Sequence, residues 1–219
     1  MPAPGEHHPA FEEYCECIFE LGEDDIDVIQ ARIAERLQVS RPAVSEMIKR
    51  LDAEGLVTTD GGIKLTRRGR NLAERVVRRH RLAERFLTDV LNLSWAEAHH
   101  EAGKWEHVMS ESVEQAMAEM LGNPTTCPHG NPIPGSGYEQ QDFSALASIE
   151  VGGSFTVKRI TEELEFAPGL LEFLEDSEIQ PGNEGTVVAA SPDGTVTVTI
   201  GDRYVGVGAF ASERILVAG

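Results

Sequence analysis

Hydrophobic residues recur at helical spacing along the first half of the chain. Over residues 11–21 the apolar positions follow one another by three or four residues, which is the stripe of an amphipathic helix. The same period predicts further helices over residues 28–37, 41–51, 68–91, 94–110 and 113–121. The first 120 residues are therefore expected to be largely helical.

The period changes to two between residues 55 and 66. Two short alternating segments flank the turn Asp60-Gly61-Gly62, a pattern that predicts a β-hairpin. Ser40 is expected to cap the helix at 41–51, and Pro42 falls in its first turn, where proline is tolerated. The order helix, turn, helix, hairpin predicts a winged helix-turn-helix domain over residues 1–70.

The rest of the chain divides by composition. Residues 71–122 continue the helical pattern, whereas 123–148 are rich in proline and glycine and are expected to form a linker. Residues 149–219 predict a small barrel-like β-domain, with strands over 154–160, 186–190, 195–200 and 204–207 and a helix near 170–175. The fold class expected is mainly α with β.

The distribution of charge points to a nucleic-acid partner. The formal net charge is −18, which by itself argues against binding DNA. Residues 41–85, however, hold 12 basic and 6 acidic residues, a net charge of +6, while 123–219 hold 4 basic and 14 acidic residues, a net charge of −10. A cationic reader is thus embedded in an acidic protein, which favours double-stranded DNA as the partner.

The helix at 41–51 is the predicted reading helix. Its apolar stripe faces the core, so the residues around that stripe and on the hairpin are expected to meet DNA bases and phosphates. These are Ser40, Arg41, Pro42, Ser45, Glu46, Lys49, Arg50 and Lys64, with further phosphate contacts from Arg67, Arg68 and Arg70. The alternative is that the helix-turn-helix unit binds protein or is purely structural, and that its arginines merely face solvent.

Two predicted helices carry metal-type side chains on one face. His80 and Glu84, at positions i and i+4, share the apolar face of the helix at 68–91, where titratable groups must be paired or ligated. The helix at 94–110 aligns His99, Gly103, Glu106 and His107 on one side. Imidazoles and carboxylates together suit Fe²⁺, Mn²⁺, Co²⁺, Ni²⁺ or Zn²⁺. On the first helix, Glu13 and Glu16 lie opposite the apolar stripe together with Cys17, where a solvated face is the usual explanation.

Other features exclude whole classes of protein. No segment approaches the ~20 apolar residues needed to cross a bilayer, and the N-terminus lacks a signal core. We therefore expect a cytoplasmic protein with no membrane partner. The chain has three cysteines, a small and odd number that makes a disulfide framework improbable. Each cysteine is therefore expected to be a free thiol or a metal ligand.

Four segments resemble the diphtheria toxin repressor and iron-dependent regulator family. They are IQARIAERLQVSRPAVSEMIKRLDAEGLV, LTRRGRNLAERVVRRHRLAERFLTDVL, WEHVMS and GNPIPG, and EEYCECIF also echoes the manganese-responsive branch. The resemblance is strongest over residues 12–135. It implies a homodimeric DNA-binding repressor with a helical dimerisation domain and a C-terminal SH3-like domain.

The resemblance also implies two metal ions per subunit. A primary site would use Glu13, Glu106 and His107, with Glu16 matching a ligand of the manganese branch. An ancillary site would use His80, Glu84 and His99, joined by Glu162 and Glu165 of the SH3-like domain. Cys127 lies in a CPHG sequence that resembles a ligand-bearing linker motif of manganese-type members.

Departures from the family bear on the choice of metal. Glu13 and Gly103 stand where the iron branch has sulfur ligands, and Gly103 offers only its backbone carbonyl. Oxygen donors favour Mn²⁺ or Fe²⁺, and this choice stays open. The alternatives to a repressor are a metallohydrolase, for which the sequence offers no phosphate loop or nucleophile elbow, and a helix-turn-helix protein regulated by a small molecule. We expect neither catalysis nor a small-molecule substrate.

Overall fold

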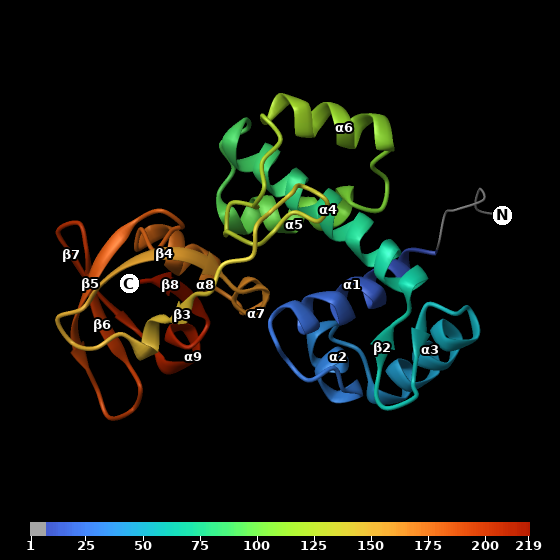
Figure 1. Cartoon of the computed structure of the whole chain (residues 1–219), viewed down its shortest axis with the longest axis horizontal. Helices are drawn as coiled ribbons and strands as arrows, with labels where there is room; N and C mark the ends of the chain where they lie inside the picture. The colour runs from blue at the N-terminus through green and yellow to red at the C-terminus, as the bar shows by residue number, and fades with distance from the viewer. Residues whose placement is uncertain (1–7) are drawn as a thin grey trace.

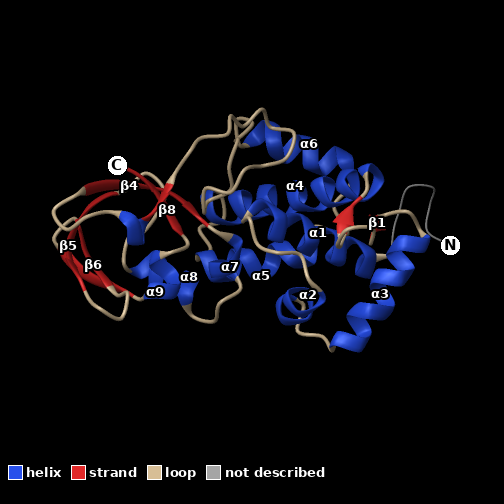
Figure 2. Ribbon diagram, turned by 60° about the horizontal axis from the view of Figure 1, so that its bottom comes forward, coloured by secondary structure: helices blue, strands red, loops and turns tan. Residues whose placement is uncertain are grey.

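Helices occupy one end of the molecule and a β-sheet the other. The structure is a computed structural model that describes residues 8–219; residues 1–7 of the predicted N-terminal domain lie outside the described residues. In Figures 1 and 2 the first helices and a short hairpin lie farthest from the sheet, with a helical region between them. Three separate apolar cores correspond to these three regions.

The N-terminal region has the predicted winged helix-turn-helix order. It contains α1 (Pro9–Glu23), α2 (Gln30–Arg36) and α3 (Arg41–Ala53), followed by the hairpin strands β1 (Val57–Thr58) and β2 (Lys64–Leu65). The hydroxyl of Ser40 accepts a hydrogen bond from the backbone N–H of Ala43 at 3.3 Å, as expected of a helix cap. Residues such as Ile33, Val44 and Leu56 are fully buried in the core of this region.

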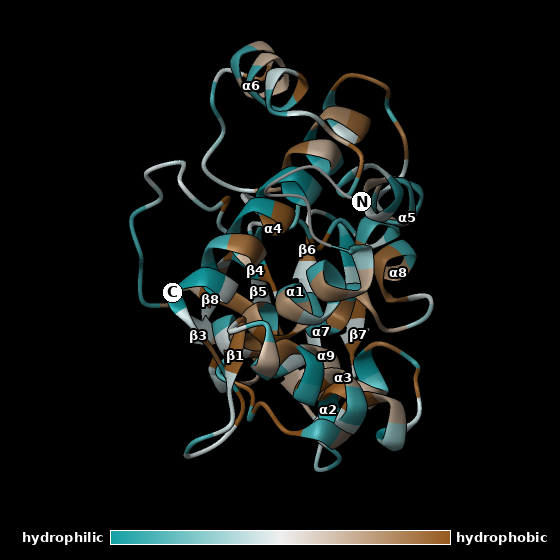
Figure 3. Ribbon diagram, turned by 90° about the vertical axis from the view of Figure 1, so that its right-hand side faces the viewer, coloured by the Kyte–Doolittle hydropathy of each residue, from teal (hydrophilic) through white to brown (hydrophobic). Residues whose placement is uncertain are grey.

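The long helix α4 (Arg67–Asp89) connects this region to the helical one (Figure 1). Thr66 caps it and donates a hydrogen bond of 2.7 Å to the carbonyl of Gly55, which ties the start of α4 to the hairpin. Apolar and polar positions alternate along α4 in Figure 3, as expected of an amphipathic helix. Its apolar face packs on α5 (Trp95–Trp105), and α6 (Glu111–Met120) follows.

The C-terminal region is a curled antiparallel sheet with the strand order β3-β8-β4-β5-β6-β7. The predicted strands are present as β4, β5, β6 and β7, and β3 and β8 were not anticipated. The strand bounds are Ser144–Ala145, Ser154–Ile160, Glu184–Ala190, Val196–Ile200, Arg203–Val207 and Ile215–Ala218. Short helices η1 (Leu146–Ser148), α7 (Glu162–Glu165), α8 (Leu170–Asp176) and α9 (Ala209–Ser212) complete the region.

Two irregularities bend this sheet. The register shifts between Val157 and Arg159 on β4 and between Val187 and Ala189 on β5. Such bulges increase strand twist and redirect side chains. The shift on β4 leaves the Arg159 side chain buried against the helical regions rather than exposed.

The proline- and glycine-rich segment is bound to the sheet along part of its length. The N–H of Ile160 donates to the carbonyl of His129 at 2.8 Å, and the Asn131 side chain donates to the carbonyl of Ile160 at 2.9 Å. Gly130 makes this approach possible, because a Cβ there would lie 2.2 Å from the carbonyl oxygen of Lys158. Residues 127–131 are thereby held in a fixed position next to α4.

None of the helices within residues 8–219 combines the length and the apolar character that crossing a bilayer requires.

Candidate metal centre and nucleic-acid interface

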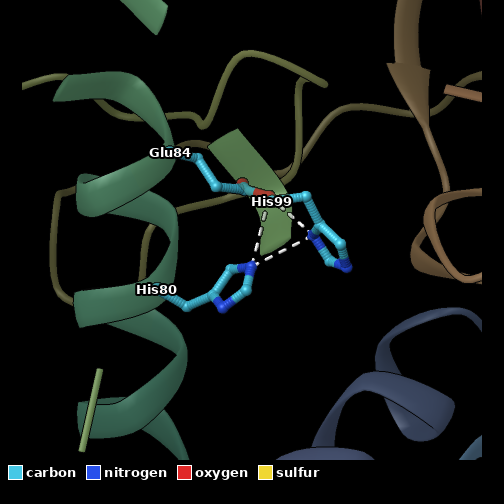
Figure 4. Close-up of side chains that lie close together, drawn as sticks. All are labelled: His80, Glu84 and His99. Atoms are coloured by element: carbon cyan, nitrogen blue, oxygen red, sulfur yellow. Dashed lines mark hydrogen bonds and ion pairs between the residues drawn. The ribbon is translucent and has the colours of Figure 1, made fainter. Parts of the chain in front are cut away.

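The helical spacing of α4 brings His80 and Glu84 to one side, where His99 of α5 meets them (Figure 4). Nε2 of His80 lies 3.2 Å from Oε1 of Glu84, and Nδ1 of His99 lies 2.9 Å from the same oxygen. The two histidine nitrogens are 3.2 Å apart. These three side chains, the His99 cluster, converge on one point, as ligands of a single ion do.

A second group lies on the other side of Glu84. Glu84 meets Cys127 and His129 of the linker, with ligand atoms within 4.8 Å of one another, and we call this the His129 cluster. Nδ1 of His129 also lies 3.0 Å from Oε2 of Glu165, which itself is 3.3 Å from Nδ1 of His99. Glu84 and Glu165 therefore connect the two clusters.

A third group joins α1 to the same place. Glu16 of α1, His80 and Glu106 form the Glu16 cluster, in which Nδ1 of His80 lies 2.5 Å from Oε2 of Glu106. The other oxygen of Glu106 lies 3.2 Å from Nε2 of His107. Three clusters thus run without interruption from α1 through α4 to the linker.

His107 is held by the first helix. Its Nδ1 lies 2.8 Å from Oε2 of Glu12, which is buried, whereas Glu13 is half exposed and lies 3.8 Å from Nε2. Glu12 also lies 3.8 Å from a guanidinium nitrogen of Arg75. The acid in closest contact with His107 is therefore Glu12, one position before the residue predicted for this role.

The surroundings shift the pKa values of these groups strongly. Burial lowers the pKa of His99, but hydrogen bonds to Glu165 and Glu84 outweigh it and raise that pKa to about 10. Burial likewise opposes the charge of His80, while Glu84 and Glu106 raise its pKa well above the usual range. Burial raises the pKa of the Cys127 thiol, and nearby Glu84 and Glu165 raise it further. Without a metal ion, the protonated form of these histidines is therefore favoured, and its positive charge offsets the charge of the neighbouring carboxylates.

The donor set fits a divalent metal ion. Two buried ligand atoms, Glu84 Oε2 and His129 Nε2, have no hydrogen-bond partner within the described part of the chain. Leaving such atoms unsatisfied in the interior is costly, and a cation coordinated by them removes that cost. Carboxylate, imidazole and thiol donors at these positions are compatible with Fe²⁺, Mn²⁺ and Zn²⁺.

An ion-pair network borders the clusters. Arg81 of α4 is fully buried, and its Nη2 lies 2.6 Å from Glu23 and 2.6 Å from Glu162. The same guanidinium donates to the carbonyl of Pro132. Glu162 therefore neutralises Arg81, while Glu165, three residues later, faces the histidines.

The predicted ligands are distributed unevenly over the site. The described structure gathers Glu16, His80, Glu84, His99, Glu106, Cys127 and Glu165 in the three clusters, with His107 adjoining. Glu13 and Gly103 line a cavity of about 520 Å³ that opens onto the clusters, and Cys17 lies there too. Glu162 is paired with Arg81.

Two residues were missed by reasoning from sequence. His129 is fully buried in the second cluster, and its signal was the cysteine two positions before it in CPHG. Glu12 carried no signal, because its neighbour Glu13 occupies the position that matches the family pattern.

The opposite end of the molecule presents the predicted reading surface. On α3, Val44, Ile48 and Leu51 are buried. Ser45 is half-buried, and the other predicted contact residues are exposed: Ser40, Arg41, Pro42, Glu46, Lys49, Arg50 and Lys64. Arg67, Arg68 and Arg70 are exposed as well, at the start of α4. The helix thus offers a cationic outer face suited to the major groove.

Comparison with known families gives three consecutive matches. Residues 8–62 match "Iron dependent repressor, N-terminal DNA binding domain", and residues 66–135 match "Iron dependent repressor, metal binding and dimerisation domain". Residues 145–219 match the FeoA domain. Together the three matches cover most of the chain.

Similar proteins and structures agree with these matches. The iron-dependent repressor IdeR of Mycobacterium tuberculosis is 41% identical over 202 residues, covering 86% of this chain and 87% of its own. The diphtheria toxin repressor of Corynebacterium diphtheriae is 36% identical over 199 residues, covering 86% of this chain and 87% of its own. A manganese-dependent transcriptional repressor in complex with manganese superposes with a TM-score of 0.84 at 32% identity, over 94% of this chain and 98% of that one. The manganese regulator SloR gives a TM-score of 0.77 at 32% identity, over 97% and 99% of the two chains.

Proposed function

Because this chain belongs to the iron-dependent repressor family, as its sequence resemblance predicted, we propose that it represses transcription by binding operator DNA when Fe²⁺ or Mn²⁺ occupies its metal centre. The observation that carries this function is the placement of the three clusters. They join α1, α4, α5 and the linker at the end of the same helix that begins at the wing. Metal binding and DNA reading are thereby linked through α1 and α4.

The ligand assignment is part of the proposal. Two ions are bound per subunit, drawing on the residues of the three clusters and on Glu165, with His107 and an acid of α1 beside them. A bound divalent cation supplies positive charge where several buried carboxylates meet. Glu16 then holds α1 against α4, and His129 holds the linker there. Metal that favours this arrangement shifts the population toward it.

Both Fe²⁺ and Mn²⁺ fit the oxygen and nitrogen donors, and the one thiol lies in the His129 cluster. The family relatives of known metal include iron-dependent and manganese-dependent repressors. We therefore retain both ions as corepressors, to be separated by competitive titration.

We further propose a homodimer that binds double-stranded DNA in the cytoplasm. The helical region exposes apolar side chains on and around α5 and α6, with Val108 at 80% and Met120 at 69% exposure. Burying such residues against a second copy removes apolar surface from water. In this division residues 1–70 read DNA, 71–122 bind metal and dimerise, 123–148 connect, and 149–219 form the SH3-like domain. The end of the connecting segment, β3 and η1, adds to the sheet and core of that domain.

The alternatives differ in measurable ways. The family consists of DNA-binding repressors and not enzymes, so the metallohydrolase is set aside. A helix-turn-helix protein controlled by a small molecule would gain no stability from added metal, whereas ligand linkage predicts a gain for this chain.

The test is metal-dependent binding to DNA selected from a random pool in the presence of Mn²⁺. Binding by the full-length protein is expected to disappear with chelator and to return with Mn²⁺ or Fe²⁺. His107→Ala is expected to lose it, while His100→Ala, an exposed neighbour on α5, keeps it. Full-strength binding in chelator would refute the metal-dependent part of the proposal.

A further inference from the structure

His80 faces two different clusters with its two ring nitrogens. Nδ1 lies 2.5 Å from Oε2 of Glu106, on the side of the Glu16 cluster. Nε2 lies 3.2 Å from Oε1 of Glu84 and 3.2 Å from Nδ1 of His99, on the side of the His99 cluster. The side chain is buried, so neither nitrogen turns freely to solvent. Figure 4 shows the ring pointing from α4 toward Glu84 and His99.

The two kinds of shared ligand differ in what they can bind. Glu84 belongs to both the His99 and the His129 clusters, and a carboxylate has two oxygens, each with lone pairs, so it can bridge two ions. A neutral imidazole has one nitrogen with a free lone pair and one that carries a proton. His80 therefore serves one ion at a time, although it belongs to two clusters.

Either tautomer of the neutral His80 ring, with its proton on Nδ1 or on Nε2, finds a hydrogen-bond acceptor. A metal-bound histidine usually donates its second N–H to a carboxylate or carbonyl, which fixes the tautomer. When Nε2 is the ligand in the His99 cluster, the Nδ1 proton has Glu106 as its acceptor. When Nδ1 is the ligand in the Glu16 cluster, the Nε2 proton has Glu84. Both states thus have a hydrogen-bond partner in place.

On the basis of the proposed metal binding, we infer that the Glu16 and His99 clusters compete for His80, so that one ion occupies either cluster but two ions never occupy both. The His129 cluster does not contain His80, and it is faced by Oε2 of Glu84 rather than by the Oε1 that faces His99, so it fills without competing for His80. Only the Glu16 cluster includes a residue of α1. The side on which His80 binds therefore decides whether this ion holds the first helix.

The test counts Mn²⁺ ions per chain by equilibrium dialysis and atomic absorption, using the full-length protein. Glu16→Gln and His99→Ala disable one cluster each and leave His80 free for the other, so each is expected to bind as many ions as the native chain. The double variant Glu16→Gln/His99→Ala and the variant His80→Ala are expected to bind one ion fewer. His100→Ala and Glu101→Gln, exposed or half-exposed positions on α5, are matched controls, and circular dichroism confirms folding.

Independent clusters give a different pattern. If Glu16→Gln or His99→Ala alone binds one ion fewer, or if His80→Ala keeps the native number, the competition is refuted while metal binding stands. A native chain that binds no Mn²⁺ refutes the proposed function and this inference with it.

Discussion

Asp24, the C-cap residue directly after α1, accepts a hydrogen bond of 2.6 Å from Nη2 of Arg159 on β4. The side chains of Asp24 and Arg159 are 2% and 8% exposed, so this ion pair is buried between the DNA-reading region and the β-domain. Oε2 of Glu23 also accepts a hydrogen bond from Nη2 of Arg159, at 3.1 Å. The contact gives the β-domain a direct connection to the first helix, independent of the metal clusters.

Arg159→Ala is expected to destabilise the protein. Without the guanidinium, Asp24 stays buried with no cation at this contact, and losing one partner of a buried ion pair costs about 3–5 kcal/mol. The measurement is urea unfolding of metal-free protein at pH 8. Arg203→Ala is the control, because its pair with Glu178 is more than half exposed and is worth at most about 1 kcal/mol. Equal losses in the two variants would contradict the prediction.

The pH dependence of stability is expected to involve Asp24. Burial raises the pKa of Asp24 from 3.8 to about 7, against the lowering effect of Arg159. Because the folded-state pKa lies above the unfolded one, protonation of Asp24 favours the fold, and this contribution is lost as pH rises from 3.8 to about 7. Asp24→Asn should therefore gain stability relative to the native chain over that range. Unfolding curves at several pH values in chelator check this, and a constant difference would refute it.

Cys127 rather than Cys17 is expected to bind metal. Cys127 lies in the His129 cluster, and a metal ion there deprotonates a thiol whose pKa burial has raised. With Co²⁺ as the probe, Cys127→Ser should lose the thiolate-to-cobalt absorption in the near ultraviolet. Cys17→Ser, an equally buried cysteine outside the clusters found among the described residues, should retain it. Absorption that survives in Cys127→Ser would exclude this ligand.

Gly130→Ala is expected to weaken metal binding by about 10–100-fold, the usual effect of disturbing the support of a ligand. The new Cβ would lie 2.2 Å from the Lys158 carbonyl oxygen, so the linker must leave β4 and carry His129 out of its cluster. Gly135→Ala has a similar positive φ and no atom within 4 Å of the new Cβ, which makes it a matched control for backbone strain. Competition with a chelating dye measures the affinity; a similar loss in both variants would point to strain alone.

Lys64 on the wing is expected to contact a DNA phosphate. Lys64→Ala should reduce the slope of log affinity against log salt concentration by about 0.9, the effect of one lost phosphate contact. Lys104→Ala removes an exposed cation of α5, paired with Glu101, and should leave the slope unchanged. Titrations of selected DNA at four salt concentrations provide the measurement. An unchanged slope in Lys64→Ala would show that Lys64 does not contact a phosphate.

Local signals in the sequence predicted much of the fold. Ser94 caps α5 in a reciprocal arrangement with Glu97, and the helical period gave α1, α4 and α5 to within a few residues, except that α5 ends at Trp105. These features depend on neighbours in sequence. The pairing of Arg159 with Asp24 depends on a bulge in β4, which no periodicity reveals.

The site shows the same division. His80 and Glu84 share a helical face, so their spacing alone brings them together. Glu12 and Glu13 differ by about 100° around α1, and the packing of the helix decides which one is buried. His129 reaches Glu84 because a hydrogen bond from β4 and the absence of a side chain at Gly130 fix the linker. Both facts belong to tertiary packing and not to local sequence.

Because α4 is one uninterrupted helix, a movement at one of its ends is transmitted to the other. Its 23 residues form a rod of about 34 Å, capped against the hairpin at one end and carrying His80 and Glu84 in its second half. A tilt of about 5° imposed at His80 or Glu84, about 20–26 Å from the start of the helix, displaces that start by about 2 Å. In the proposed dimer, a small rearrangement around a bound ion would tilt both copies of α4 and so would change the distance between the two α3 helices.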